Sequence, residues 1–232
     1  MQAKTTDPRL DHVRTERMQR SERGLDRQVV AGALLALTGI GMILAIITNE
    51  ALYPAERHYT TFANSISDLS GTLPPNSYMV EPNRAIFIAT MACGGVLVLV
   101  ASCLLWPMIA RRRVVVGLAL MGAGLVGIAV FPGNVEMWHP LFAMLAFVAG
   151  SVTVVMSRKV LEAPTKYFAT TLGVVALIAT VLGQEAFESW GLQAAIGIGG
   201  TERWIAYPVL LWLVVFGTTL MTRPAEGESG RP

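Results

Sequence analysis

The run Tyr59–Arg84, YTTFANSISDLSGTLPPNSYMVEPNR, is the longest polar stretch between two hydrophobic segments of this 232-residue chain. Four short polar side chains, Asn64, Ser65, Ser67 and Asp68, fall within five consecutive positions. Aromatic and apolar residues are threaded between them, and a solvated linker has no use for such residues. We therefore expect this run to pack onto the mouth of a helix bundle.

The rest of the composition is that of a membrane protein. The chain is 53% hydrophobic and 15% charged, with a mean hydropathy of +0.52, whereas soluble domains carry about 25% charged residues. Six segments of 17 to 22 residues contain no Asp, Glu, Lys, Arg or His, and about 20 residues suffice to cross a bilayer. They are residues 29–48, 85–106, 114–131, 140–157, 167–183 and 204–222. The pattern predicts an all-α, six-helix transmembrane bundle over residues 29–222, between a charged tail, 1–28, and a short tail, 223–232.

The distribution of basic residues predicts the orientation of this bundle. Fifteen of the 18 lysines and arginines lie in the two tails and in the second and fourth connections, and the others are Arg57, Arg84 and Arg203. Basic connections stay on the cytoplasmic side. We therefore expect a multi-pass protein of the cell membrane with both termini cytoplasmic.

The amino-terminal tail, 1–28, carries seven basic and five acidic residues. It could be disordered and solvated or a basic helix on anionic lipid, and the small excess of bases favours the solvated tail. It contains no aromatic side chains for base stacking, so no nucleic-acid partner is expected.

Three short motifs at the outer helix ends resemble a known family. They are Asn64-Ser-Ile-Ser-Asp68-Leu, Phe131-Pro132 with His139-Pro140, and Thr201-Glu202-Arg203 before an apolar span containing Trp212. Together they are similar to the domain-of-unknown-function 998 family, and the resemblance covers roughly residues 29–222. It implies a small six-helix membrane protein of a prokaryote, and it names no activity.

The candidate binding residues share one location, because all of them belong to outer loops or outer helix ends. They are Asn64, Ser65, Asp68, His139, Glu202 and Arg203. Ion-coupled carriers and proton relays usually place ionisable groups at mid-membrane, and the six apolar segments have none. The pattern favours non-enzymatic binding of a lipid or amphiphile at an outward-facing polar vestibule, or a supporting membrane role. No cofactor or metal is expected, and the oligomeric state is left open.

A membrane-embedded hydrolase is the alternative function. Ser67 or Ser65 could act as nucleophile with His139 and Asp68, although no G-x-S-x-G motif supports this. A zinc site would have to combine His58 and His139 with carboxylates, and no H-E-x-x-H motif is present. An enzyme should place a nucleophile or a metal within hydrogen-bond reach of His139. The simplest interpretation of the Asn64–Asp68 run is that its short side chains cap and fix the loop.

Two contacts can also be predicted. Arg203 would be costly to leave unpaired in a partly dry site, and Asp68 is its expected carboxylate partner. Thr201 is expected to be the N-cap of the sixth span. It follows a break at Gly197-x-Gly199-Gly200, before which a short helix could form.

Overall fold

The computed structural model describes residues 8–71, 78–107, 112–135, 137–183 and 191–222. Within these ranges the chain forms six long helices and two short 3₁₀ turns, with no strand. The helices are α1 (Pro8–Ala51), α2 (Asn83–Leu105), α3 (Arg112–Val130), α4 (Trp138–Ser157), α5 (Thr165–Leu182) and α6 (Leu192–Thr222). All six contain a stretch long and apolar enough to cross a membrane. The predicted six-helix membrane bundle is therefore confirmed, and the protein is a multi-pass membrane protein.

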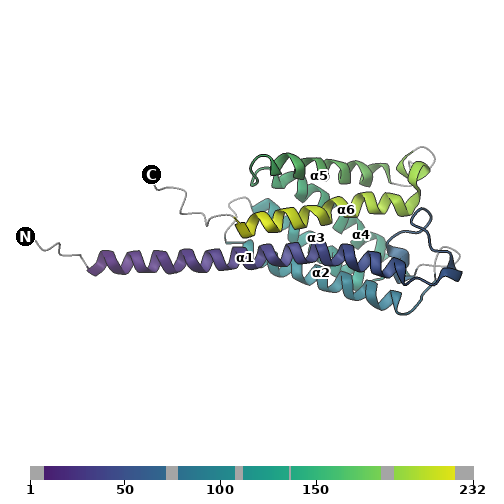
Figure 1. Cartoon of the computed structure of the whole chain (residues 1–232), viewed down its shortest axis with the longest axis horizontal. Coiled ribbons are helices and arrows are strands. Elements are labelled where there is room, and N and C mark those ends of the chain that lie inside the picture. Colours follow the sequence, from purple (N-terminus) through teal and green to yellow (C-terminus); the bar gives the residue numbers. More distant parts are fainter. Residues whose placement is uncertain (1–7, 72–77, 108–111, 136, 184–190, 223–232) are drawn as a thin grey trace, which may run out of the picture.

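The helices form a closed ring. Each helix packs against the next along the chain, and α6 packs back against α1. We call one end of the bundle the loop end, because it carries residues 52–71, 78–82 and 131–135. The opposite end is the terminal end, where α6 finishes and α1 enters the bundle (Figure 1). This arrangement brings residues from the first and last helices together at the loop end.

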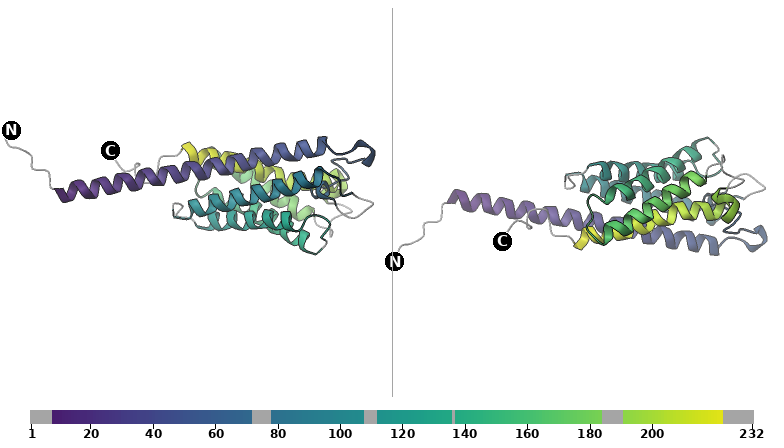
Figure 2. Two further views of the ribbon diagram at one scale, coloured as in Figure 1. Left: turned by 90° about the horizontal axis from the view of Figure 1, so that it is seen from below. Right: turned by 90° about the horizontal axis from the view of Figure 1, so that it is seen from above.

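Helix α1 is much longer than the first span. It begins at Pro8, and its amino-terminal part projects beyond the terminal end of the bundle in both views of Figure 2. The part suited to crossing a membrane is Arg27–Ala51. The tail is therefore helical from residue 8 onward and continuous with the span, and it differs from the solvated, unstructured tail that the sequence favoured.

Helix α6 begins at Leu192, twelve residues before the predicted start of the sixth span. Gly197 interrupts it with φ 72° and ψ 170°, a conformation that glycine adopts without steric cost. The expected break and the short helix before it are thus present. The N-cap prediction is wrong, because Thr201 lies inside the helix and its hydroxyl donates to the Gly197 carbonyl at 2.8 Å.

Glycines allow the helices to approach closely. A Cβ on Gly32 would lie 2.5 Å from the Gly217 carbonyl oxygen of α6, and one on Gly39 would lie 2.4 Å from the Leu210 carbonyl oxygen. In lipid, where the hydrophobic effect does not drive helix association, such close backbone packing is a main source of cohesion. The α1–α6 contact therefore depends on these two positions of α1.

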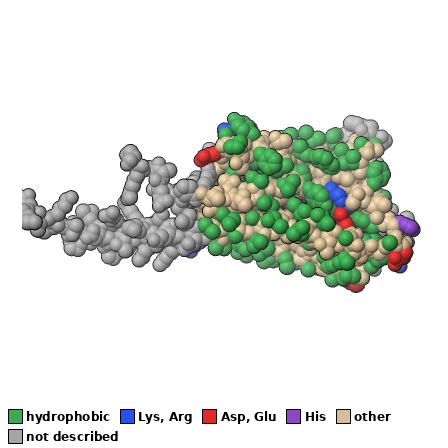
Figure 3. Space-filling model, viewed as in Figure 1, with side chains coloured by type: hydrophobic (Ala, Val, Ile, Leu, Met, Phe, Trp, Pro, Cys, Tyr) green, Lys and Arg blue, Asp and Glu red, His purple; other side chains and the backbone are tan. Residues whose placement is uncertain are grey.

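Apolar side chains cover the outside of the bundle as well as its inside. Leu37, Ile40 and Leu44 of α1 are about half exposed, and Figure 3 shows hydrophobic side chains over most of one face, with charged groups mainly near its ends. Inside, Trp212 is fully buried and its indole N–H donates to the Ser157 hydroxyl at 3.0 Å. An apolar exterior suits a lipid surrounding, and inside the bundle this buried indole N–H has its hydrogen-bond partner.

The α1–α6 packing predicts a difference between two neighbouring glycines. Gly39→Ala should destabilise the protein by about 1–3 kcal/mol, because the new methyl group would overlap the α6 backbone. Gly41→Ala is the matched control, since a Cβ there meets nothing within 4 Å. Thermal unfolding in detergent should show a lowered midpoint for Gly39→Ala alone. Equal midpoints for the two variants would contradict the close contact.

Candidate functional site

The Asn64–Asp68 run forms a tight turn that its own side chains hold together. The Asp68 carboxylate accepts a hydrogen bond from the Ser65 backbone N–H at 2.8 Å, and the Asp68 N–H donates to the Ser65 hydroxyl at 3.1 Å. This reciprocal pair is a capping box, and it overlaps the start of the 3₁₀ turn Ser67–Ser70. Asn64 adds a second tie, because its side-chain oxygen accepts from the Thr60 N–H at 3.0 Å. The interpretation of these residues as loop-fixing is confirmed.

Arg203 joins this loop to helices α1 and α6. Its Nε and Nη2 groups both donate to one oxygen of Glu50, at the end of α1. Nη2 also donates to the Tyr59 hydroxyl at 2.7 Å. Nη1 donates to the carbonyls of Gly199 at 2.6 Å and Asn64 at 3.1 Å. The guanidinium therefore connects three segments that are far apart in sequence.

The predicted pair between Asp68 and Arg203 is wrong. A guanidinium has five N–H donors, and the acceptors supplied by Glu50, Tyr59 and the loop carbonyls account for all five. No donor is left for Asp68. The carboxylate that pairs with Arg203 is Glu50, which comes from the carboxyl end of the first helix.

Tyr59 transmits this contact into the loop. Its hydroxyl accepts from Arg203 and donates to the Ser65 carbonyl at 2.9 Å. Burial raises the pKa of Tyr59, although the charge of Arg203 acts in the opposite direction. The hydroxyl therefore keeps its proton at neutral pH and can serve as donor and acceptor at once.

The loop backbone lies directly on the first turn of α6 after its break. The Gly199 N–H donates to the Phe62 carbonyl at 3.1 Å. A Cβ on Gly197 would lie 2.0 Å from the Phe62 oxygen, and one on Gly199 would lie 2.1 Å from the Asn64 oxygen. Two glycines are thus needed here because the loop carbonyls occupy the space of a side chain.

Glu202 binds the opposite side of the same loop. One carboxylate oxygen accepts hydrogen bonds from the backbone N–H groups of Ile66 at 2.6 Å and Ser67 at 3.3 Å. The other oxygen lies 3.2 Å from the Ser67 hydroxyl. Glu202 therefore accepts hydrogen bonds from the loop backbone. The sequence predicted it as a binding residue but did not predict these contacts.

His139 approaches Ser67 from the start of α4. Its Nδ1 lies 2.9 Å from the Phe131 carbonyl oxygen, and its Nε2 lies 3.0 Å from the Ser67 hydroxyl oxygen. A carbonyl only accepts, so Nδ1 carries a proton. The structure thus brings together three candidates, Ser67, His139 and Glu202, whereas it places Asp68 in the capping box.

The Ser67 hydroxyl carries one proton, so it can donate to Glu202 Oε1 or to Nε2 of His139, but not to both at once. The Asp68 carboxylate lies near enough for its charge to act on both His139 and Glu202. The site therefore joins a hydroxyl, an imidazole and two carboxyl groups.

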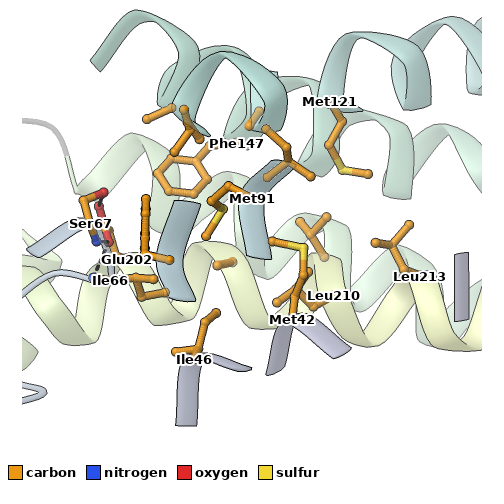
Figure 4. Close-up of a pocket in the computed structure, with 17 residues that line it drawn as sticks. Met42, Ile46, Ile66, Ser67, Met91, Met121, Phe147, Glu202, Leu210 and Leu213 are labelled. Atoms are coloured by element: carbon orange, nitrogen blue, oxygen red, sulfur yellow. Dashed lines mark hydrogen bonds between the residues drawn. The ribbon is translucent and has the colours of Figure 1, made fainter. Parts of the chain in front are cut away.

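A cavity of about 60 Å³ begins at this cluster and runs between the helices. Figure 4 shows the side chains of Ser67 and Glu202 together at one end, with Met42, Met91 and Met121 farther along. The remaining lining residues are apolar, among them Ile46, Phe87, Phe147, Ala206 and Leu213. The cavity thus has one polar end and an apolar length.

The zinc alternative finds no ligand set in the described residues. His58 lies at the exposed turn after the 3₁₀ segment Ala55–Arg57, away from the buried His139 cluster. No group of three or more His, Cys, Asp or Glu side chains in the described part of the chain could hold a metal ion.

Comparison with known proteins identifies a family. A family model described as "Protein of unknown function (DUF998)" matches residues 45–219, which include every residue of the two networks around Glu202 and Arg203. No curated protein and no solved structure matches the sequence.

The Arg203 network predicts which substitutions are coupled. Arg203→Ala should cost about 3–5 kcal/mol, because it leaves the Glu50 carboxylate without its buried partner. Glu50→Gln should then add little to Arg203→Ala, whereas Asp68, which meets Arg203 indirectly through Asn64 and Ser65, should be coupled to it more weakly than Glu50 is. Thermal unfolding of the single and double variants in detergent measures both cycles. Strong coupling of Arg203 to Asp68, with none to Glu50, would contradict the observed pairing.

Proposed function

We propose that this chain, which belongs to the DUF998 family of proteins of unknown function, binds an amphiphile inside the helix bundle. The headgroup would meet Ser67 and Glu202, and the apolar part would enter the cavity between the helices. The observation that carries the proposal is the separation of polar and apolar lining along a single cavity. Ligand sites commonly combine an apolar lining with a few placed polar groups.

The side chains that line the cavity could make room for a ligand larger than its 60 Å³ volume. Three of the apolar residues are methionines, Met42, Met91 and Met121. Methionine is unbranched and adapts its shape to irregular spaces. Rotation of these side chains would lengthen the apolar compartment without moving a helix.

The polar end favours a particular headgroup. Glu202 offers carboxyl oxygens and Ser67 a hydroxyl at this end of the cavity. A headgroup with hydroxyl or ammonium donors could replace the Ser67 hydroxyl at Glu202. A carboxylate headgroup would instead face another carboxyl group, which is unfavourable. The proposed ligand is therefore a neutral or cationic amphiphile.

A hydrolase is the second candidate, and one observation favours it. Ser67 lies within hydrogen-bond distance of His139, whose Nδ1–H is oriented by the Phe131 carbonyl. This is the relation of nucleophile, base and orienting group in serine hydrolases. Against it, Glu202 occupies the N–H groups of Ile66 and Ser67, which would otherwise be the donors to an oxyanion. Binding therefore remains the first proposal.

The proposed orientation places the loop end outside the cell and both termini in the cytoplasm. The support is the distribution of basic residues, fifteen of which lie in the tails and in the connections at the terminal end. The headgroup site would then face the outer leaflet, and amphiphiles would reach it from there.

Cysteine labelling tests this orientation. In a background without Cys93 and Cys103, Glu56→Cys at the loop end should react with an impermeant maleimide in intact cells. Lys159→Cys at the terminal end should react only after lysis, because the membrane would shield it. Both positions are exposed, so the reverse labelling pattern would overturn the orientation.

Filling the cavity tests the binding proposal. Ala206 lines the cavity one turn after Glu202, so Ala206→Phe should reduce the co-purified amphiphile more than about tenfold. The reason is that losing the burial of two methylene groups costs roughly 1.6 kcal/mol. Leu211→Phe is the control, since Leu211 is on the same helix but exposed. Mass spectrometry of extracted lipids provides the measurement.

The same extracts separate the two candidate functions. Binding alone predicts an intact amphiphile in the wild type and in Ser67→Ala. Cleavage products that vanish in Ser67→Ala would favour the hydrolase. Equal amphiphile in Ala206→Phe and the wild type would reject the cavity as the binding site.

A further inference from the structure

A groove of about 500 Å³ lies on the outside of the bundle between α3 and α4. It extends from the terminal end of these helices, and its residues do not overlap those of the internal cavity. Most of its lining is apolar and comes from Val116, Leu120, Leu145, Val148 and Met156. Two arginines, Arg112 and Arg113, line its mouth at the first turn of α3.

The mouth of the groove has the side chains typical of a membrane interface. The Arg112 guanidinium carbon lies 5.3 Å from the centre of the Trp106 ring, and Trp106 is about half exposed. Tryptophan is enriched at the level of lipid headgroups, and arginine extends its charge to the same level while its stem covers apolar surface. The two arginines therefore lie where lipid phosphates would be found.

The length of the groove matches one leaflet. Along α4 it runs from Leu145 to Met156, which is about 16 Å at the rise of an α-helix. The hydrocarbon core of a bilayer is about 30 Å thick, so this is close to half of it. Val116, Leu120 and Val148 are each 41–46% exposed, which leaves the groove accessible to an acyl chain.

We propose that this groove binds an anionic phospholipid of the leaflet at the terminal end. One acyl chain would lie along the groove, and the phosphate would contact Arg112 and Arg113. Neither arginine forms an ion pair with another residue that the structure describes, and guanidinium groups bind phosphate through paired hydrogen bonds. The site is separate from the proposed amphiphile cavity, so either proposal can fail while the other stands.

Lipid titration tests the charge requirement. Purified protein in detergent is titrated with phosphatidylglycerol or phosphatidylcholine, and bound lipid is counted by native mass spectrometry. Arg112→Gln with Arg113→Gln should weaken phosphatidylglycerol binding at least about tenfold, since each arginine near a lipid surface contributes about fivefold. Phosphatidylcholine binding should change less than about twofold.

A matched control separates this site from general attraction. Arg158 and Lys159 are exposed basic residues just after α4 and do not line the groove. Arg158→Gln with Lys159→Gln should leave phosphatidylglycerol affinity within about twofold of the wild type. An equal loss in both pairs would overturn the proposal, because it would show attraction by net charge alone.

Filling the groove tests the acyl chain. Val148→Phe adds volume at an exposed position of α4, and it should weaken phosphatidylglycerol binding at least about fivefold with both arginines intact. Unchanged binding in Val148→Phe would refute the acyl-chain part of the proposal. Displacement of the lipid by an equal concentration of inorganic phosphate would also overturn it, because it would indicate a site for a free anion.

Discussion

The buried guanidinium of Arg203 must find a hydrogen-bond acceptor for each of its N–H groups, and the rest of the structure depends on this requirement. Arg203 lies eleven residues after the start of α6 and is 8% exposed, and an arginine that is buried without partners is very costly. Its acceptors come from the end of α1, from the first loop and from α6 itself. The α1–α6 contact that closes the helix ring therefore has an electrostatic clamp at the loop end, in addition to the glycine packing farther along these helices.

The neighbouring residue uses the other side of the same loop. Consecutive residues of a helix point about 100° apart, so Glu202 and Arg203 contact different groups. Arg203 binds carbonyl oxygens of Asn64 and Gly199, whereas Glu202 binds the N–H groups of Ile66 and Ser67. Glu202 thus accepts from backbone N–H groups of the loop, and Arg203 donates to backbone carbonyls. The loop can present both kinds of group because its short polar residues turn the backbone through the capping box.

The parts of this structure that could be predicted from the sequence depend on local patterns. Hydropathy gives six spans, and the crowding of short side chains in Asn64–Asp68 gives a fixed loop. The partner of Arg203 could not be derived, because several acids belong to the same end of the bundle and only the closure of α6 onto α1 selects Glu50. The contact of Ser67 with His139 joins residues 72 apart in sequence. Its signals in the sequence were that a serine and a histidine could form a nucleophile–base pair and that both belonged to motifs next to the membrane spans.

The position of Ser67 limits what a ligand can gain from the polar end. Its hydroxyl lies within hydrogen-bond distance of Glu202 and His139, and the residue also lines the cavity. A headgroup that donates to Glu202 must therefore replace the existing hydrogen bond from Ser67. Such an exchange contributes little net free energy, because one hydrogen bond replaces another. For an amphiphile bound as proposed, affinity would come mainly from the apolar cavity, at about 0.8 kcal/mol for each buried methylene group. A headgroup that displaced the Ser67 hydroxyl without donating a hydrogen bond would leave one Glu202 oxygen unpaired, at a cost of about 1–3 kcal/mol. Such a ligand would be selected by its headgroup and retained by its apolar part.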